Sequence, residues 1–92
     1  MEGNESLRGF SPIQEKELRV AASMNKSLLF ELLYIEGAGY ALRTNGGSEI
    51  GGFVLVTNAN KRPRLFRSLD TGVELIKSFN PEVSKITITI DR

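Results

Sequence analysis

The chain has 92 residues, 40% of them apolar and 25% charged, which is enough for one compact domain and too few for two. Its net charge of +1 excludes a uniformly basic nucleic-acid coat and an acidic mimic of DNA. The chain contains no histidine and no cysteine, which excludes disulfides, thiol nucleophiles, imidazole bases and zinc sites built from nitrogen and sulfur ligands. We therefore predict a protein that is not an enzyme and has no metal or cofactor.

Residues 1–10 are expected to form a flexible arm, and residues 11–92 a single domain. The large apolar side chains of the arm are Leu7 and Phe10, too few to offset the entropy of ordering it. Its polar, acidic start does not resemble a signal or transit peptide, and the chain has no run of about 18 apolar residues. We expect a soluble, cytoplasmic protein without a membrane segment.

The first predicted element is a helix from about Pro12 to Met24. Ser11 can cap it, Pro12 suits the first helical position, and Gln14 can complete a capping box. The apolar stripe of this helix is thin and is interrupted by Glu17, so the pattern specifies a helix more firmly than it specifies what the helix packs against.

The segment from Leu28 to Ile35 fits two periodicities, because its leucines repeat as on a helix while every second residue is also apolar, as in a strand. We interpret it as a strand. The following Gly37-Ala38-Gly39 supplies the positive-φ positions of a hairpin turn, and residues 40–44 continue as a second strand.

Two further strands are predicted after this hairpin. Asn45-Gly46-Gly47 is a turn signal, and residues 53–57 have the strongest strand pattern in the chain. Gly51 and Gly52, just before that strand, indicate a bulge or bend. Arg64 to Phe66 is a short strand, with Pro63 at its edge.

The last two elements are a helix over residues 69–79 and a strand over residues 85–91. Ser68 is a good N-cap, Asp70 lies where a carboxylate favours the helix dipole, and Lys77 lies where a cation does. The final strand alternates isoleucine and threonine, which predicts that its three isoleucines enter the core and its threonines face solvent.

The element order α-β-β-β-β-α-β predicts an α+β fold, with an antiparallel sheet of about four to five strands and one or two helices packed on one face. A right-handed crossover through the second helix would place the last strand beside an earlier one, in parallel with residues 64–66. Long, flat edge strands invite pairing with another copy, so a homodimer through sheet edges is a further expectation.

The main functional signal is the basic run Lys61-Arg62-Pro63-Arg64-Leu65-Phe66-Arg67, which has no acidic residue between Glu49 and Asp70. In an extended strand Arg62 and Arg64 point to the same side, and arginine binds phosphate or carboxylate through two parallel hydrogen bonds. An alternative interpretation is that these cations only protect a solvated edge strand from aggregation.

Arg43 either extends this basic patch or pairs with Glu31 or Glu49 across a hairpin. The acidic residues show no spacing that indicates a catalytic pair. A hydrolase using Mg²⁺ would require Glu31, Glu49 and Asp70 to meet in one cleft.

The sequence KRPRLFRSLDTGVELIKSF, from Lys61 to Phe79, follows a strand led by tyrosine and an FVLV strand. This arrangement resembles the C-terminal half of small plasmid- and mobile-element-encoded proteins described as partition-associated. The resemblance covers Tyr40 to Ile90. It implies an accessory role on bacterial plasmids, phages or integrated elements, with DNA or a DNA-binding protein as the target, and it implies no catalytic residue.

The leading hypothesis is therefore a non-enzymatic binding module of a plasmid, phage or mobile element. It would contact DNA or a DNA-handling protein through Lys61, Arg62, Arg64 and Arg67, with Arg43 as a further candidate. The alternative is a phage- or plasmid-encoded inhibitor that binds a host or defence complex by protein–protein contact.

Overall fold

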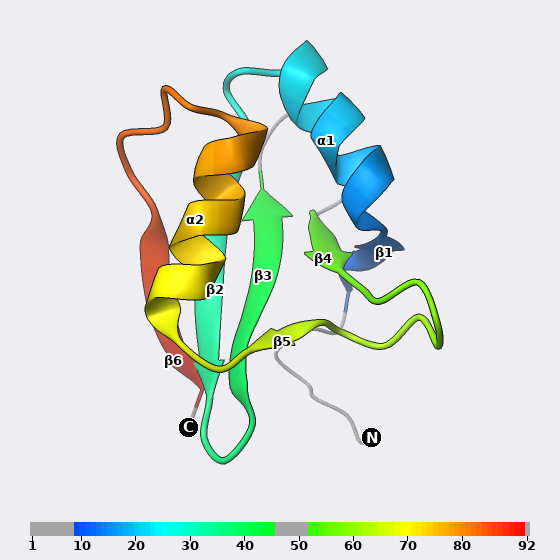
Figure 1. Ribbon diagram of the computed structural model, residues 1–92, viewed down its shortest axis with the longest axis vertical. Helices are drawn as coiled ribbons and strands as arrows, with labels where there is room; N and C mark the ends of the chain where they lie inside the picture. The colour runs from blue at the N-terminus through cyan, green and yellow to red at the C-terminus, as the bar shows by residue number, and fades with distance from the viewer. Residues whose placement is uncertain (1–8, 46–51, 92) are drawn as a thin grey trace.

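The computed structural model describes residues 9–45 and 52–91, which form an α+β fold with two helices and a mixed sheet (Figure 1). The elements are, in chain order, β1 (Ser11–Ile13), α1 (Glu15–Met24), β2 (Leu29–Ile35), β3 (Gly39–Asn45), β4 (Phe53–Leu55), β5 (Leu65–Phe66), α2 (Leu69–Phe79) and β6 (Thr87–Asp91). The predicted flexible arm, up to residue 8, and the predicted turn at Gly46 and Gly47 lie outside the described residues. Neither helix in these ranges is long and apolar enough to cross a membrane.

The strand order is β1-β4-β3-β2-β6, and β5 pairs with β3 beside β4. The central pairs are antiparallel, but β1 runs parallel to β4 and β6 runs parallel to β2. The predicted antiparallel pairing therefore holds for the central strands but not for the two outer strands, of which the last was expected to run parallel, although to a different partner. The predicted pairing of the last strand with residues 64–66 is also wrong. The free edge of β3 is already occupied by β4 and β5, so the crossover through α2 places β6 on the other side of the hairpin, against β2.

The start of the domain also differs from the prediction. Residues 11–13 form strand β1 instead of the first turn of a helix, because their backbone pairs with β4: Ser11 N donates to Gly52 O over 3.0 Å, and Val56 N donates to Ile13 O over 2.9 Å. Helix α1 begins after Gln14, whose backbone N–H donates to Glu17 Oε1 over 3.0 Å in a capping box. The helix start is thus set by Gln14 and not by Ser11.

The hairpin of β2 and β3 confirms the strand interpretation of this segment, in a register that runs from Leu29 opposite Asn45 to Ile35 opposite Gly39. Gly37 and Gly39 have φ angles of 83° and 126°, as the turn signal predicted. A Cβ atom on Gly39 would lie 2.5 Å from the carbonyl oxygen of Phe66, so this glycine also allows β5 to approach the hairpin.

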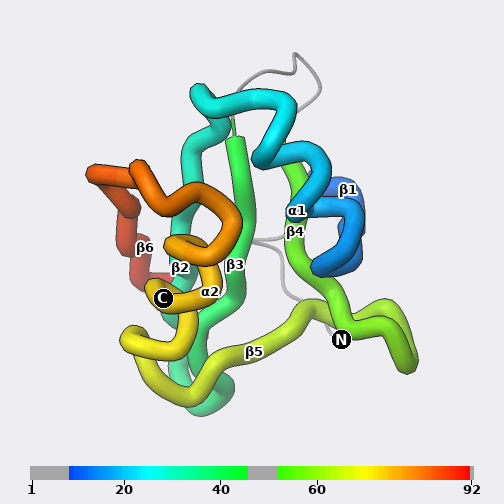
Figure 2. Tube along the Cα trace, turned by 45° about the horizontal axis from the view of Figure 1, so that its top comes forward, coloured from blue at the N-terminus to red at the C-terminus, as the bar shows by residue number. Residues whose placement is uncertain are grey.

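Both helices lie on the same face of the sheet, as Figures 1 and 2 show. The main core forms between them and the sheet, and its fully buried members include Leu18, Leu32, Leu42, Leu55 and Ile76. The opposite face carries a smaller cluster made of Leu33, Ala41, Val54 and Val56, with Phe10 and Ile35 packed against it. Helix α2 confirms its prediction, including the cap: Ser68 Oγ accepts a hydrogen bond from Thr71 N over 3.3 Å.

Strand β6 corrects the prediction that three isoleucines enter the core. Ile86 is half-buried against the main core, but Ile88 and Ile90 are 47% and 58% exposed. They do lie on the helix side, in register with Leu32 and Tyr34 of β2. However, α2 packs over β2, β3 and β5, and therefore leaves the outermost strand uncovered (Figure 2).

Candidate functional site

The predicted binding residues are divided between two parts of the molecule. Lys61, Arg62, Arg64 and Arg67 lie in or beside β5, between the end of β4 and the start of α2, whereas Arg43 lies in the middle of β3. Their positions, exposures and partners determine which of them are available to an external anion.

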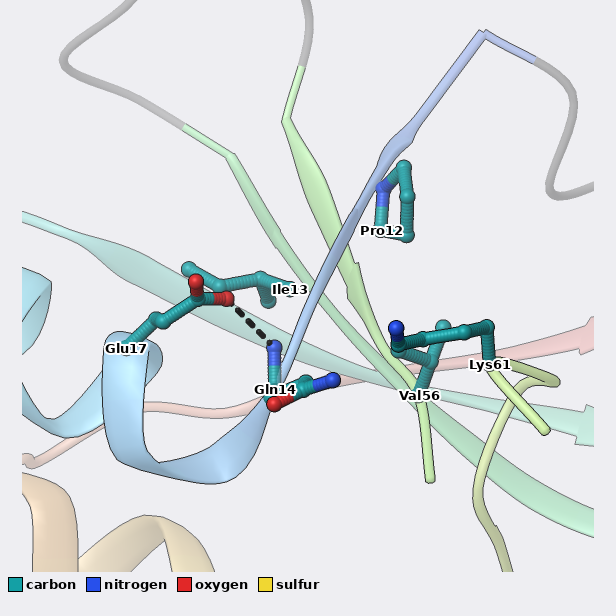
Figure 3. Close-up of a pocket in the computed structure, with 6 residues that line it drawn as sticks. All are labelled: Pro12, Ile13, Gln14, Glu17, Val56 and Lys61. Carbon is teal, nitrogen blue, oxygen red and sulfur yellow. Dashed lines mark hydrogen bonds between the residues drawn. The ribbon is translucent and has the colours of Figure 1, made fainter. Parts of the chain in front are cut away.

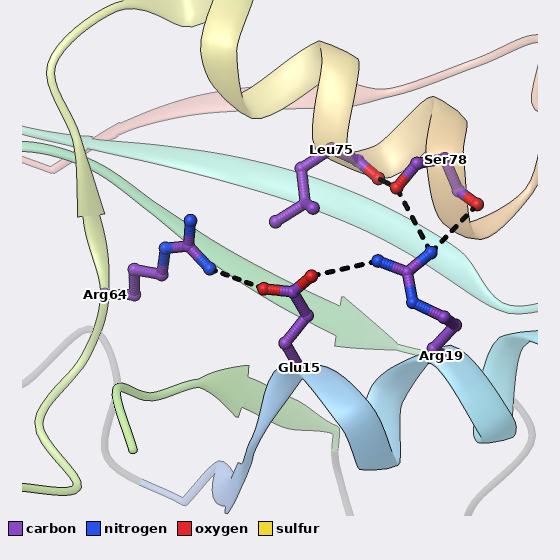
Figure 4. A network of polar contacts seen from close by, with 5 residues as sticks. All are labelled: Glu15, Arg19, Arg64, Leu75 and Ser78. Carbon is purple, nitrogen blue, oxygen red and sulfur yellow. Dashed lines mark hydrogen bonds and ion pairs between the residues drawn. The ribbon is translucent and has the colours of Figure 1, made fainter. Parts of the chain in front are cut away.

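Arg64 is held by an acid of the protein itself. Its Nη1 atom donates to Glu15 Oε1 over 2.8 Å (Figure 4). Its guanidinium also lies 5.1 Å from the ring centroid of Phe66. Glu15 Oε2 also accepts from Arg19 Nη2 over 2.9 Å. The hydrogen bonds from Arg64 and Arg19 lower the pKa of Glu15 below its ordinary value of 4.5.

The same network reaches helix α2. Arg19 Nη1 donates to the backbone oxygen of Ser78 over 3.3 Å, and the Arg19 guanidinium lies 4.8 Å from the ring centroid of Phe79. Through Arg64, Glu15 therefore links the start of β5 to α1, and Arg19 links α1 to α2. This arrangement indicates a structural role for Arg64, because its guanidinium joins elements that are distant in sequence.

Arg43 is also paired with an acid of the protein, at a site that is more buried than that of Arg64. Its Nε and Nη2 atoms donate to the two carboxylate oxygens of Glu31 over 2.7 and 2.9 Å, and the side chains of Arg43 and Glu31 are only 14% and 20% exposed. The Thr89 hydroxyl donates to Glu31 Oε2, and the ring of Phe10 lies 4.9 Å from the guanidinium. The pKa of Glu31 is lowered mainly by the hydrogen bonds from Arg43, which outweigh the effect of burial.

The Glu31 partner was one of the alternatives left open for Arg43, and it is confirmed; the other, Glu49, lies outside the described residues. The sheet also separates Arg43 from Arg64. Arg43 is in register with Val54 of the cluster opposite the helices, whereas Arg64 lies over Phe66 of the main core. Of the two alternatives for Arg43, extension of the basic patch is therefore not observed, and Arg64 is paired with Glu15 and not available as an unpaired cation.

Lys61, Arg62 and Arg67 remain exposed, and we call them the free cations. Within residues 9–45 and 52–91 they form no ion pair. Lys61 and Arg62 lie on a turn between β4 and β5, and Arg67 follows β5 directly. The turn is ordered by Asn60, whose Oδ1 atom accepts from the Thr57 hydroxyl over 2.6 Å and from Arg62 N over 3.2 Å.

A surface hollow of 220 Å³ lies beside this turn (Figure 3). It is lined by Pro12, Ile13, Gln14, Glu17, Val56 and Lys61. The hollow offers one cation and one carboxylate, and the carboxylate of Glu17 is already engaged with the backbone of Gln14. It is too small for a drug-sized ligand.

The hydrolase hypothesis required three carboxylates in one cleft. Among the described residues no group of three histidine, cysteine, aspartate or glutamate side chains is placed to hold a metal ion. Glu31 is bound to Arg43, Asp70 lies in the first turn of α2, and Glu49 is outside the described ranges.

Sequence reasoning missed two features that matter for this surface. Glu15 captures Arg64 from 49 positions away, and no local pattern connects the two residues. The exposure of Ile88 and Ile90 was also missed, because an alternating strand has the same pattern in the middle of a sheet and at its edge.

Comparisons with protein families, with curated proteins and with solved structures each found no match. The resemblance to partition-associated proteins therefore stays a prediction, and the geometry described above is what bears on function.

Proposed function

We propose that the protein is a non-enzymatic binding module of a plasmid, phage or mobile element that contacts the phosphate backbone of DNA through the free cations Lys61, Arg62 and Arg67. The observation that supports this proposal is their exposure, without an ion pair to any other residue in the described part of the chain. Arg43 and Arg64 are not direct contacts in this proposal. Arg64 instead holds the segment next to β5, which lies between Arg62 and Arg67, against α1.

The electrostatics set the expected strength of binding. Each neutralised phosphate releases counterions, so three contacts give a slope of log affinity against log salt on the order of −3. Binding of this kind is weak for a single copy at physiological salt and shows little sequence preference, because contacts to phosphate carry no base information.

The test measures binding of a labelled DNA duplex over a range of salt concentrations. The double variant Lys61→Ala/Arg62→Ala should lower affinity at least about tenfold at low salt and reduce the magnitude of the salt slope by about 2. The matched control is Lys16→Ala/Lys26→Ala, which removes the same charge from exposed positions on and just after α1 and should change affinity less than about threefold. Equal losses in the two variants, or no binding to the wild-type protein at low salt, would contradict the proposal.

The second candidate is a phage- or plasmid-encoded inhibitor that binds a host or defence complex. Its support is a pair of exposed apolar side chains, Val20 and Met24, which lie four residues apart on one side of α1. A complex resting on these groups should survive moderate salt, since burial of apolar area is not screened by ions. Met24→Lys should abolish such a complex, while Lys61→Ala/Arg62→Ala should leave it intact.

A further inference from the structure

Strand β6 has an outer edge that no strand occupies in the described part of the chain. Its inner edge pairs with β2 from Thr87 to Asp91. Natural proteins protect edges with charges, prolines or bulges, and the segment from Ile86 to Ile90 contains none of the three kinds of protection. Ile88 and Ile90 are largely exposed on the helix side of this edge. The edge is therefore suited to accept a further strand.

The sequence at this edge is complementary to itself. Lys85-Ile86-Thr87-Ile88-Thr89-Ile90-Asp91 has the same alternation of isoleucine and threonine in both directions, with a cation at one end and a carboxylate at the other. Opposite residues of an antiparallel pair lie on the same face of the sheet, so an antiparallel copy would set isoleucine against isoleucine and threonine against threonine.

We propose that two copies of the chain pair through β6 in an antiparallel register centred on Ile88. In this register Ile88 meets Ile88 of the second copy, Ile86 meets Ile90, Thr87 meets Thr89, and Lys85 meets Asp91. The two sheets become one continuous sheet around a two-fold axis, and both exposed isoleucines of each copy are covered. This isologous contact is the usual form of a homodimer.

The terminal charges distinguish this register from its neighbours. An antiparallel register centred on Thr89 also sets isoleucines together, but it places Asp91 opposite Thr87 and leaves Lys85 without the carboxylate. An in-register parallel pair would place Lys85 beside Lys85 and Asp91 beside Asp91, which is repulsive. Only the register centred on Ile88 forms two Lys85–Asp91 pairs for each dimer.

The first test uses the absence of cysteine from the chain, which allows single cysteines to report the register. Under mild oxidation Ile88→Cys should give a disulfide-linked dimer, because the two Cα atoms at the centre of an antiparallel pair lie about 4.5 to 5.5 Å apart. The control is Ile90→Cys, whose site is more exposed but lies about 13 Å from its equivalent in this register. It should link at least about tenfold more slowly, whereas a mixture of Ile86→Cys and Ile90→Cys should link the two variants to each other.

Equal rates for Ile88→Cys and Ile90→Cys would overturn the proposal, because they would indicate random collision. Fastest linking by Thr89→Cys would overturn the register. A wild-type chain that stays monomeric by analytical ultracentrifugation at millimolar concentration would overturn the dimer. The paired segment is short, so we expect a dimer that dissociates on dilution.

The second test exchanges the terminal charges. Lys85→Asp places carboxylates at both ends of the seam, and Asp91→Lys places cations at both ends, so each variant alone should dimerise about tenfold more weakly than the wild type. Mixing the two should restore wild-type affinity in a one-to-one complex, with circular dichroism confirming that each variant is folded. Unchanged self-association of either variant would contradict the Lys85–Asp91 pairing.

This inference does not rest on the proposed DNA contact, since none of its residues is a free cation. A monomeric protein that binds DNA would overturn the dimer alone. A protein that links through Ile88→Cys but binds no DNA would overturn the proposed function alone.

Discussion

The two faces of the sheet each hold a glutamate–arginine pair of nearly the same length, but the pairs lie in different surroundings. On the helix-covered face Glu15 and Arg64 are 2.8 Å apart and about 40% exposed. On the opposite face Glu31 and Arg43 are 2.7 Å apart and at most 20% exposed. Distance alone would rank them as equal. Their burial indicates that the Glu31–Arg43 pair matters more for stability, because water screens this pair less and solvates its separated charges less well.

The largest effect expected from this comparison concerns the apolar layers on the two faces. Leu32 and Leu33 are adjacent and almost fully buried, but they point to opposite faces. Leu32→Ala should lower the free energy of unfolding by about 2 to 5 kcal/mol, because it opens a cavity in the main core. Leu33→Ala should lower it less, since the smaller cluster can relax into the space. Urea unfolding measures both, and a larger loss for Leu33→Ala would reverse our ranking of the two faces.

The next effect concerns the more buried ion pair. Glu31→Gln preserves the shape of the side chain but leaves the charge of Arg43 with less compensation at a half-buried site. We expect a loss of about 1 to 3 kcal/mol in the free energy of unfolding, less than for a fully buried pair. Glu31→Gln/Arg43→Met should recover part of this loss, because it removes the charge left behind. If the double variant is less stable than Glu31→Gln alone, the loss of the Glu31 charge beside Arg43 is not the cause.

A smaller effect is expected at the exposed pair. Glu15→Gln should cost less than about 1 kcal/mol, because side chains that are about 40% exposed retain much of their hydration. The comparison predicts that Glu15→Gln lowers the free energy of unfolding, measured with urea, by less than Glu31→Gln does. A greater loss would indicate that the links from Glu15 to Arg64 and Arg19 act as a cooperative network.

The pH dependence of stability tests the lowered pKa values of the same two carboxylates. The pKa values of Glu15 and Glu31 are both lowered in the folded state, so each carboxylate contributes stability above its ordinary pKa of 4.5 and loses that contribution as the pH falls through its folded value. Between pH 6 and pH 3 the wild type should therefore lose more stability than Glu31→Gln does. Thermal unfolding across this range measures the difference, and parallel curves would contradict a lowered pKa for Glu31.

The elements with strong local signals were predictable from the sequence. The strands of the hairpin follow from the glycines of the turn, and α2 follows from its cap at Ser68 and its apolar face. The start of α1 was mispredicted because the Ser-Pro signal at residues 11 and 12 describes only local preferences. Hydrogen bonds to a strand more than 40 positions away, β4, override these preferences.

The candidate surface was predictable only in its composition. The basic run indicated cations beside a short strand, and three of them are exposed. The capture of Arg64 by Glu15 depends on where α1 lies against β5, and the exposure of Ile88 depends on which strand ends the sheet. Both are properties of the assembled fold that no window of the sequence encodes.

The hairpin turn also has a practical consequence for anyone who labels or extends this protein. Gly37 and Gly39 both have positive φ angles at which a side chain is strained, and a Cβ atom on Gly39 would also collide with the carbonyl of Phe66, whereas Ala38 between them already carries a Cβ atom and is exposed. A fluorophore or an epitope tag can therefore be attached at the exposed Ala38 without disturbing the domain, but any side chain at Gly39 would push away the strand that leads to Arg67. Ala38 is thus suited to labelling, whereas its neighbour Gly39 cannot be substituted without displacing β5.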